Sequence, residues 1–150
     1  MIAALFLSFL ATALEQTPPQ GWWVVKDSKG LCQIAVPPNW QALLENTGAA
    51  VLQEATNAIA VVTSQPAQAF KPLPDTLQRM LGIRKNELFE NSAKRVFYQE
   101  KVSHRPDEAN AYNAIVPGRT GTCSCHVVAL PSVAEETAKN IALSLGPVEP

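Results

Sequence analysis

Residues 22–36 read Trp22-Trp23-Val24-Val25-Lys26-Asp27-Ser28-Lys29-Gly30-Leu31-Cys32-Gln33-Ile34-Ala35-Val36. The β-branched and aromatic residues at 22–25 and the apolar run at 31–36 are typical of strands, and the polar residues between them are typical of a turn. Strands joined by such a short turn are antiparallel, because parallel neighbours need a long crossover. The stretch therefore predicts a β-hairpin, which ends at Pro37 because proline cannot donate to a central ladder.

Further strand patterns occur on both sides of a central helical pattern, whereas residues 41–45 predict neither a strand nor a helix. The strand patterns lie at residues 49–53, 58–64, 94–103, 110–116 and 122–130. The last two predict a second hairpin across the turn at 117–121, which contains Pro117 and two glycines. The expected order is therefore four strands, a helix, three strands and a second helix.

Two stretches predict helices that begin with a capping box, the pairing of a helix-capping side chain with a Gln or Glu three residues later. Asp75 and Gln78 have this spacing at the start of an expected helix over residues 75–89. Ser132 and Glu135 have it before the second helix, which Gly146-Pro147 should end. The apolar faces of both helices must be buried, so we expect an α+β sandwich built on a single antiparallel sheet.

The run Gly30–Trp40 ends its strand with Pro37-Pro38-Asn39-Trp40, and this opening resembles that of PsbP-like domains. That family includes the photosystem II accessory protein, bacterial lipoproteins of the DcrB type and a nuclear-transport factor that binds the GTPase Ran. The order of elements over residues 21–145 is similar. The resemblance implies an α/β/α sandwich, an antiparallel sheet with helices on both faces. It also implies binding or assembly more than catalysis, and it transfers no catalytic residues.

The first 14 residues contain no charged side chain, and the small residues Ala11-Thr12-Ala13 follow an apolar run. This pattern is typical of a secretory signal peptide, although no Lys or Arg precedes the apolar run. The run is shorter than the roughly 20 residues of a membrane span. We expect a signal peptide over residues 1–13 and export to a periplasmic or secreted location. An uncleaved anchor and a structural segment of a cytosolic protein are the alternatives.

The rest of the chain has the length and composition of one domain. Residues 14–20 contain two prolines and predict an extended tether, and residues 21–150 predict a single α+β domain. The chain has 12 Lys and Arg against 13 Asp and Glu, a net charge of −1. Such a balance provides no field that would attract phosphates or anionic lipid, so we expect no nucleic-acid partner and no stable membrane span.

Three cysteines are the first candidates for chemistry. Cys123 and Cys125 are two residues apart on a predicted strand, so both side chains point to the same face. Cys32 lies on another strand, and it can form a disulfide with either of them if the strands are neighbours. The alternative is that all three are small buried hydrophobic residues. A metal site would need convergent ligands, but His126 should face away from the cysteines, so we expect no metal and no cofactor.

A few exposed or aromatic residues are candidates for a binding surface. Trp22 and Trp23 point to opposite faces of a regular strand, so one can lie in the core while the other meets a helix, a ligand or a partner. Arg119 lies in a Gly-Arg-Thr-Gly sequence that is typical of a hairpin turn more than of a phosphate loop. His104 lies in a charged turn and is expected on the surface.

The sequence shows no constellation typical of an enzyme active site. It therefore predicts an exported, non-enzymatic domain that binds a protein partner in the envelope or outside the cell. Two alternatives belong to other classes. One is a metal- or thiol-handling protein that uses Cys32, Cys123 and Cys125. The other is a small-ligand carrier with a pocket between helix and sheet near Trp22, Trp23 and Phe70.

Overall fold

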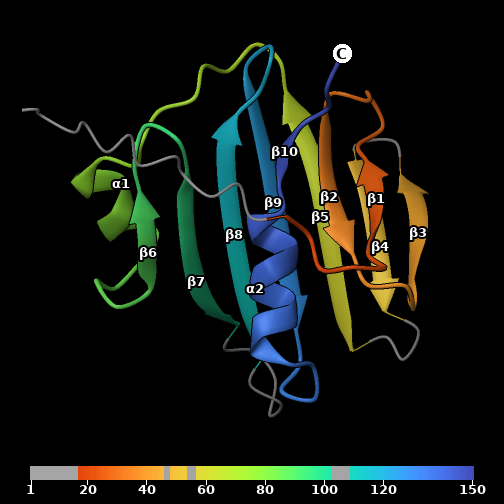
Figure 1. Cartoon of the computed structure of the whole chain (residues 1–150). Helices are drawn as coiled ribbons and strands as arrows, with labels where there is room; N and C mark the ends of the chain where they lie inside the picture. Colours follow the sequence, from red (N-terminus) through yellow and green to blue (C-terminus); the bar gives the residue numbers. More distant parts are fainter. Residues whose placement is uncertain (1–16, 46–47, 54–56, 103–108) are drawn as a thin grey trace, which may run out of the picture.

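The structure, a computed structural model, describes residues 17–45, 48–53, 57–102 and 109–150 (Figure 1). The elements in chain order are β1 (Trp23–Lys26), β2 (Cys32–Val36), β3 (Trp40–Glu45), β4 (Gly48–Gln53), β5 (Ala58–Gln65), α1 (Asp75–Met80), β6 (Leu88–Asn91), β7 (Val96–Val102), β8 (Ala109–Pro117), β9 (Thr122–Ala129), α2 (Glu135–Leu143) and β10 (Gly146–Pro147). The predicted leader over residues 1–13 and His104 lie outside the described residues.

The strands form two antiparallel sheets, and with the two helices they make an α+β fold, as predicted. One sheet has three strands in the order β1-β2-β10, and the other has seven in the order β3-β4-β5-β9-β8-β7-β6. The expectation of a single sheet is wrong. The chain leaves the first hairpin at Pro37-Pro38, and proline cannot continue a ladder, so β3 starts a separate sheet instead of extending the first.

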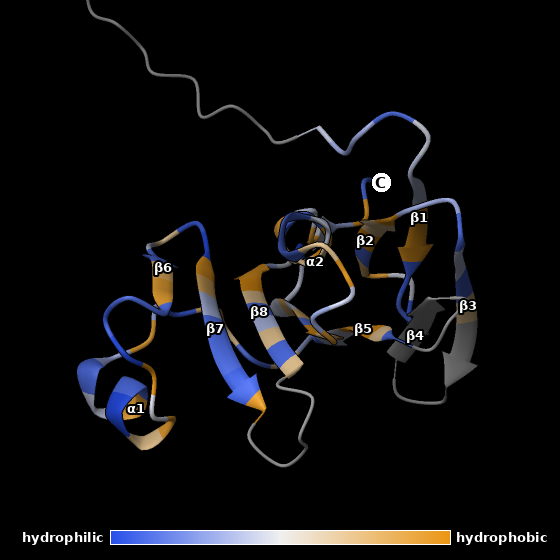
Figure 2. Ribbon diagram, turned by 90° about the horizontal axis from the view of Figure 1, so that it is seen from below, coloured by the Kyte–Doolittle hydropathy of each residue, from blue (hydrophilic) through white to orange (hydrophobic). Residues whose placement is uncertain are grey.

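One face of the seven-stranded sheet is covered by two elements that lie side by side. Figure 1 shows α2 in front of β8 and β9, with the small sheet of β1 and β2 next to it over β5 and β4. Figure 2 shows α1 beside β6 and β7, away from α2. The small sheet thus covers an area of this face that a helix would cover in a simple α/β/α sandwich.

The core lies mainly under α2 and the small sheet. Among its fully buried members are Ile34 of β2, Val62 of β5, Val127 of β9 and Ile141 of α2. A second, smaller cluster lies on the opposite face of the large sheet. It comprises Leu73, Val96 and Tyr98, with Phe70, Ile83, Leu88 and Ile115 packed against them.

The first predicted helix is shorter than expected. α1 ends at Met80, and Gly82 follows with a positive φ of 69°, which favours glycine and ends the helix. The predicted capping box is absent, because Pro74 occupies the N-cap and the Gln78 side-chain amide donates to the Leu73 carbonyl at 2.8 Å. The remainder of the predicted helix, around Leu88, instead forms β6 at the edge of the sheet.

The second predicted helix is confirmed in place and in its buried face. Ala138, Ile141 and Ala142 are fully buried, whereas the expected capping bond of Ser132 is not formed because Ala134 is the N-cap. The helix ends at Leu143 with Ser144 as its C-cap, shortly before the predicted stop at Gly146-Pro147. Gly146-Pro147 pairs with β2 as β10, which the sequence did not predict. Among the residues described, no helix is both long and apolar enough to cross a membrane.

Candidate functional site

A disulfide joins the two sheets. Cys32 of β2 and Cys123 of β9 are bonded with an S–S distance of 2.02 Å and a Cα–Cα distance of 5.6 Å, and both side chains are buried. The prediction of one disulfide that includes Cys32 is confirmed. The partners lie in different sheets, one packed on the other, whereas we expected neighbouring strands of one sheet. Buried disulfides are typical of proteins in oxidising compartments, and this feature is compatible with an exported protein.

Cys125 is the free cysteine, and it lies on the same side of β9 as Cys123, as predicted. Burial raises the pKa of its thiol to about 12, so the thiol stays protonated and is a poor nucleophile or ligand. His126 is exposed and faces away from the cysteines, as expected. Within the described ranges, no group of three or more His, Cys, Asp or Glu side chains is placed to hold a metal. The three cysteines therefore do not form a set of thiolate ligands.

A buried carboxylate lies next to the disulfide. Asp27 accepts hydrogen bonds from the backbone N–H of Leu31 at 2.8 Å, from that of Cys32 at 2.9 Å and from the Ser64 hydroxyl at 2.5 Å. Burial alone would raise the pKa of Asp27, but these hydrogen bonds and one from the Lys29 N–H outweigh it and hold the pKa below 3.8. The sequence identified Asp27 only as a turn residue, and it placed Ser64 at the end of the strand predicted over residues 58–64, which forms β5.

The aromatic residues predicted as a surface contribute to the core. Trp22 and Trp23 are both half-buried against the main core cluster, and the Trp23 indole N–H donates to the Pro37 carbonyl at 3.0 Å. Phe70 packs in the second cluster, on the opposite face of the large sheet. Trp22 and Trp23 therefore do not lie in the same cluster as Phe70, with which the carrier alternative grouped them. Arg119 is exposed in the β8–β9 turn.

Helix α1 presents its apolar side chains to solvent. Leu77, Met80 and the adjoining Leu81 are 37%, 79% and 43% exposed, and no residue of α1 is buried. We call these three residues the α1 patch. Leu77 and Leu81, but not Met80, line a cavity of about 440 Å³, whose apolar lining also includes Phe70 and Leu73. The sequence predicted this helix but placed its apolar stripe against the sheet.

The surroundings of the α1 patch are basic. Residues 71–87 contain four basic and two acidic side chains, namely Lys71, Arg79, Arg84, Lys85, Asp75 and Glu87. Among the described residues, none of the four basic side chains has a carboxylate oxygen within 4.0 Å. The patch is thus an apolar surface with a positively charged border.

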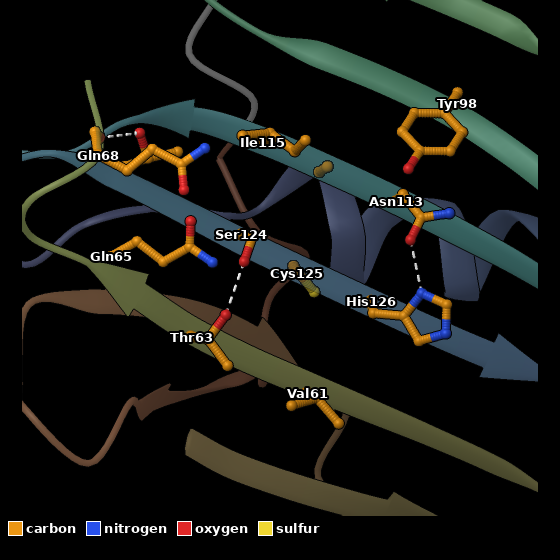
Figure 3. Close-up of a pocket in the computed structure, with 12 residues that line it drawn as sticks. Val61, Thr63, Gln65, Gln68, Tyr98, Asn113, Ile115, Ser124, Cys125 and His126 are labelled. Carbon is orange, nitrogen blue, oxygen red and sulfur yellow. Dashed lines mark hydrogen bonds between the residues drawn. The ribbon is translucent and has the colours of Figure 1, made fainter. Parts of the chain in front are cut away.

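A second concave region lies on the opposite face of the seven-stranded sheet from α2 and the small sheet. We call it the sheet-face hollow. It has a volume of about 460 Å³ and is lined by side chains from β5, β7, β8 and β9, which Figure 3 shows from above the sheet. Thr63 and Ser124 share a hydrogen bond of 2.6 Å across two neighbouring strands.

A chain of hydrogen bonds orients the imidazole at one end of this hollow. Asn113 lies between Glu100 and His126: its Nδ2 donates to Glu100 Oε2 at 3.1 Å, and its Oδ1 lies 2.5 Å from His126 Nδ1. Tyr98 directs its hydroxyl toward the hollow (Figure 3). Burial and the charge of Glu100 raise the pKa of Tyr98 to about 12, so this hydroxyl remains a donor at neutral pH. Sequence reasoning missed the hollow, because its residues come from four strands.

Comparison with known proteins reveals similarity of fold alone. No family model and no curated protein sequence matches the chain. Among solved structures, a crystal structure of a protein from Bacteroides thetaiotaomicron VPI-5482, at 1.50 Å resolution, is similar with a TM-score of 0.55 and 8% sequence identity. The match covers 79% of this chain and 45% of that one, so this chain spans less than half the length of the similar protein.

Proposed function

We propose that this chain is an exported, non-enzymatic domain that binds a protein partner through the α1 patch and the adjoining cavity. The observation that carries the proposal is that α1 buries no residue while it exposes Leu77, Met80 and Leu81 together. Fully burying a Leu or Met side chain is favourable by about 1.5–3 kcal/mol. A contiguous group of such side chains beside a cavity is typical of a protein-interaction site.

The charges around the patch define the chemistry of the partner. The basic border described above would attract acidic side chains, and oppositely charged rims speed association and select partners. The cavity lined by Phe70 and Leu73 can accept one apolar anchor side chain. The partner we propose is therefore a protein segment with an apolar anchor flanked by Asp or Glu. The buried Cys32–Cys123 disulfide supports an oxidising, extracytoplasmic location for this interaction.

The test is site-specific photo-crosslinking in cells of the source organism. A photoreactive amino acid is placed at Met80, and in a matched control it is placed at Ser28, which is exposed in the β1–β2 turn. We expect a discrete crosslinked product from position 80 and none from position 28. The captured protein is then purified, and its affinity for the full chain is measured by titration calorimetry.

The affinity measurement uses two variants that introduce the same charge. Met80→Glu should weaken binding by about tenfold or more, because it desolvates a carboxylate in an apolar contact. Ser28→Glu should leave the affinity within about twofold, because the turn lies away from the contact. Equal crosslinking from both positions, a product that is a second copy of this chain, or equal effects of the two variants would each contradict the proposal.

A further inference from the structure

The side chains that line the sheet-face hollow include uncharged amides, hydroxyls and one imidazole, with aliphatic side chains at two opposite sides (Figure 3). Gln65, Gln68 and Asn113 supply amides, and Val61 and Ile115 supply apolar surface. Among the described residues that line the hollow, none is Asp, Glu, Lys or Arg. An anionic ligand would therefore lose its hydration there without gaining a counter-charge. Its volume of about 460 Å³ lies within the usual range for small-molecule sites.

The hydrogen bonds of Asn113 determine what His126 offers to a ligand. Asn113 Nδ2 donates to the carboxylate of Glu100, so the atom that faces the imidazole is the carbonyl oxygen Oδ1. That oxygen can only accept, and therefore His126 Nδ1 carries the proton. In the neutral imidazole the other nitrogen, Nε2, is then an acceptor, and the side chain is exposed. The network thus leaves His126 Nε2 as a hydrogen-bond acceptor for a donor group on a ligand.

The position of the hollow argues against two other occupants. It lies over β5, β9 and β8, whose backbone groups already pair with one another. An extended peptide that adds as a strand needs a free sheet edge, so recognition here depends on side chains. An aliphatic chain would leave the amides and hydroxyls without partners, and each such loss is unfavourable.

We infer that the sheet-face hollow binds a neutral saccharide. A sugar ring presents hydroxyls that both donate and accept, which match the side chains of Gln65, Asn113 and the Thr63–Ser124 pair. One sugar hydroxyl donates to His126 Nε2, and the apolar face of the ring lies on Val61, which pairs with His126 between β5 and β9. The hollow adjoins the cavity beside the α1 patch, because both are lined by Gln68, Tyr98, Ile115 and Thr122. None of the α1 patch residues lines the hollow, and His126 does not line that cavity.

The test follows the side-chain amide resonances of Gln65, Gln68 and Asn113 in the isotope-labelled full chain. The probes are glucose, galactose, mannose, N-acetylglucosamine and maltose. The comparison ligands are glucuronate, glucose 6-phosphate, decanoate and a blocked neutral tripeptide. We expect a neutral saccharide to shift these amides saturably and to bind more tightly than every comparison ligand.

Variants then separate this inference from the proposed function. His126→Ala should weaken the saccharide by about threefold to tenfold, the effect of one lost hydrogen bond, and leave the protein partner's affinity unchanged. Met80→Glu should weaken the binding of the protein partner and leave the saccharide affinity unchanged. Ser124→Ala serves as a second variant if His126→Ala lowers the melting temperature. No saturable shift with any neutral sugar, tighter binding of a comparison ligand, or unaltered saccharide affinity in His126→Ala and in Ser124→Ala would overturn the inference.

Discussion

The hydroxyl of Ser64 donates a 2.5 Å hydrogen bond to the carboxylate of Asp27, which lies 37 residues earlier in the chain. Asp27 belongs to the turn of the small sheet, and Ser64 belongs to β5 of the large one. In the large sheet Ser64 pairs directly with Cys123, the residue that forms the disulfide to Cys32. A polar contact and a covalent bond therefore connect the two sheets at the same place.

The Asp27 contact predicts a dependence of stability on pH. The folded state holds the pKa of Asp27 below its ordinary value of 3.8, so the ionised carboxylate stabilises the fold. This contribution is complete above pH 3.8 and is lost as the pH falls through the lower, folded pKa. Asp27→Asn keeps the shape of the side chain but removes the titrating carboxyl group. The free energy of unfolding of this variant should therefore vary less with pH in the acid range. Urea unfolding at a series of pH values measures both curves.

A second variant tests whether the hydrogen bonds carry this effect. Asp27→Ala leaves the N–H groups of Leu31 and Cys32 without their acceptor, and it should lower the free energy of unfolding by about 2–3 kcal/mol at neutral pH. Asp75→Ala is the control, because Asp75 is exposed on α1 and should have little effect. Parallel acid profiles for the wild type and Asp27→Asn would contradict this account.

The disulfide should contribute a large part of the stability. Cys32 and Cys123 are 91 residues apart, and closing so long a loop restricts the unfolded chain. Replacing both with serine should lower the free energy of unfolding by about 2–5 kcal/mol. Urea unfolding with and without dithiothreitol provides the measurement. Cys125→Ala is the control and should still be destabilised by the reductant. Equal stability of the wild type under both conditions would show that the bond does not act in this way.

Local patterns predicted the elements whose partners are close in sequence. The strand patterns along β1 and β2, and again along β8 and β9, were enough to predict both hairpins, because the register of paired strands follows from a short turn. The same period of two correctly placed Cys123 and Cys125 on one face and His126 on the other. These predictions required no knowledge of how distant segments pack.

Features that depend on distant segments could not be predicted in this way. Gly146-Pro147 is a normal helix stop, and only its position beside β2 makes it a strand. The sheet-face hollow needs four strands in the right order. Leu77, Met80 and Leu81 have the spacing of a buried stripe, but Gly82 ends the helix before it can lie along the sheet. Apolar periodicity alone does not distinguish a core face from an interaction surface.

Cys125 should be unreactive in the folded chain. Its thiol is buried, and burial raises its pKa to about 12, so almost no thiolate exists at about pH 8. Iodoacetamide should therefore modify the native, unreduced protein very slowly and add a single group once urea unfolds it. Mass spectrometry over time measures the rate, and Cys125→Ala provides the blank. Fast labelling in the native state would mean that the strand opens locally.

Gly121 should be far less tolerant of substitution than Gly30, although both have a positive φ, of 81° and 66° respectively. A Cβ on Gly121 would collide with the backbone carbonyl oxygen of Gln65 and with Pro66, whereas one on Gly30 would meet nothing within 4 Å. Gly30→Ala should lower the free energy of unfolding by about 1 kcal/mol, the strain of the left-handed conformation alone. Gly121→Ala adds a backbone collision where the β8–β9 turn lies against the end of β5, and should lower it by about 3 kcal/mol or more. Urea unfolding of the two variants separates these effects, and equal losses would show that the turn can move away from β5 at little energetic cost.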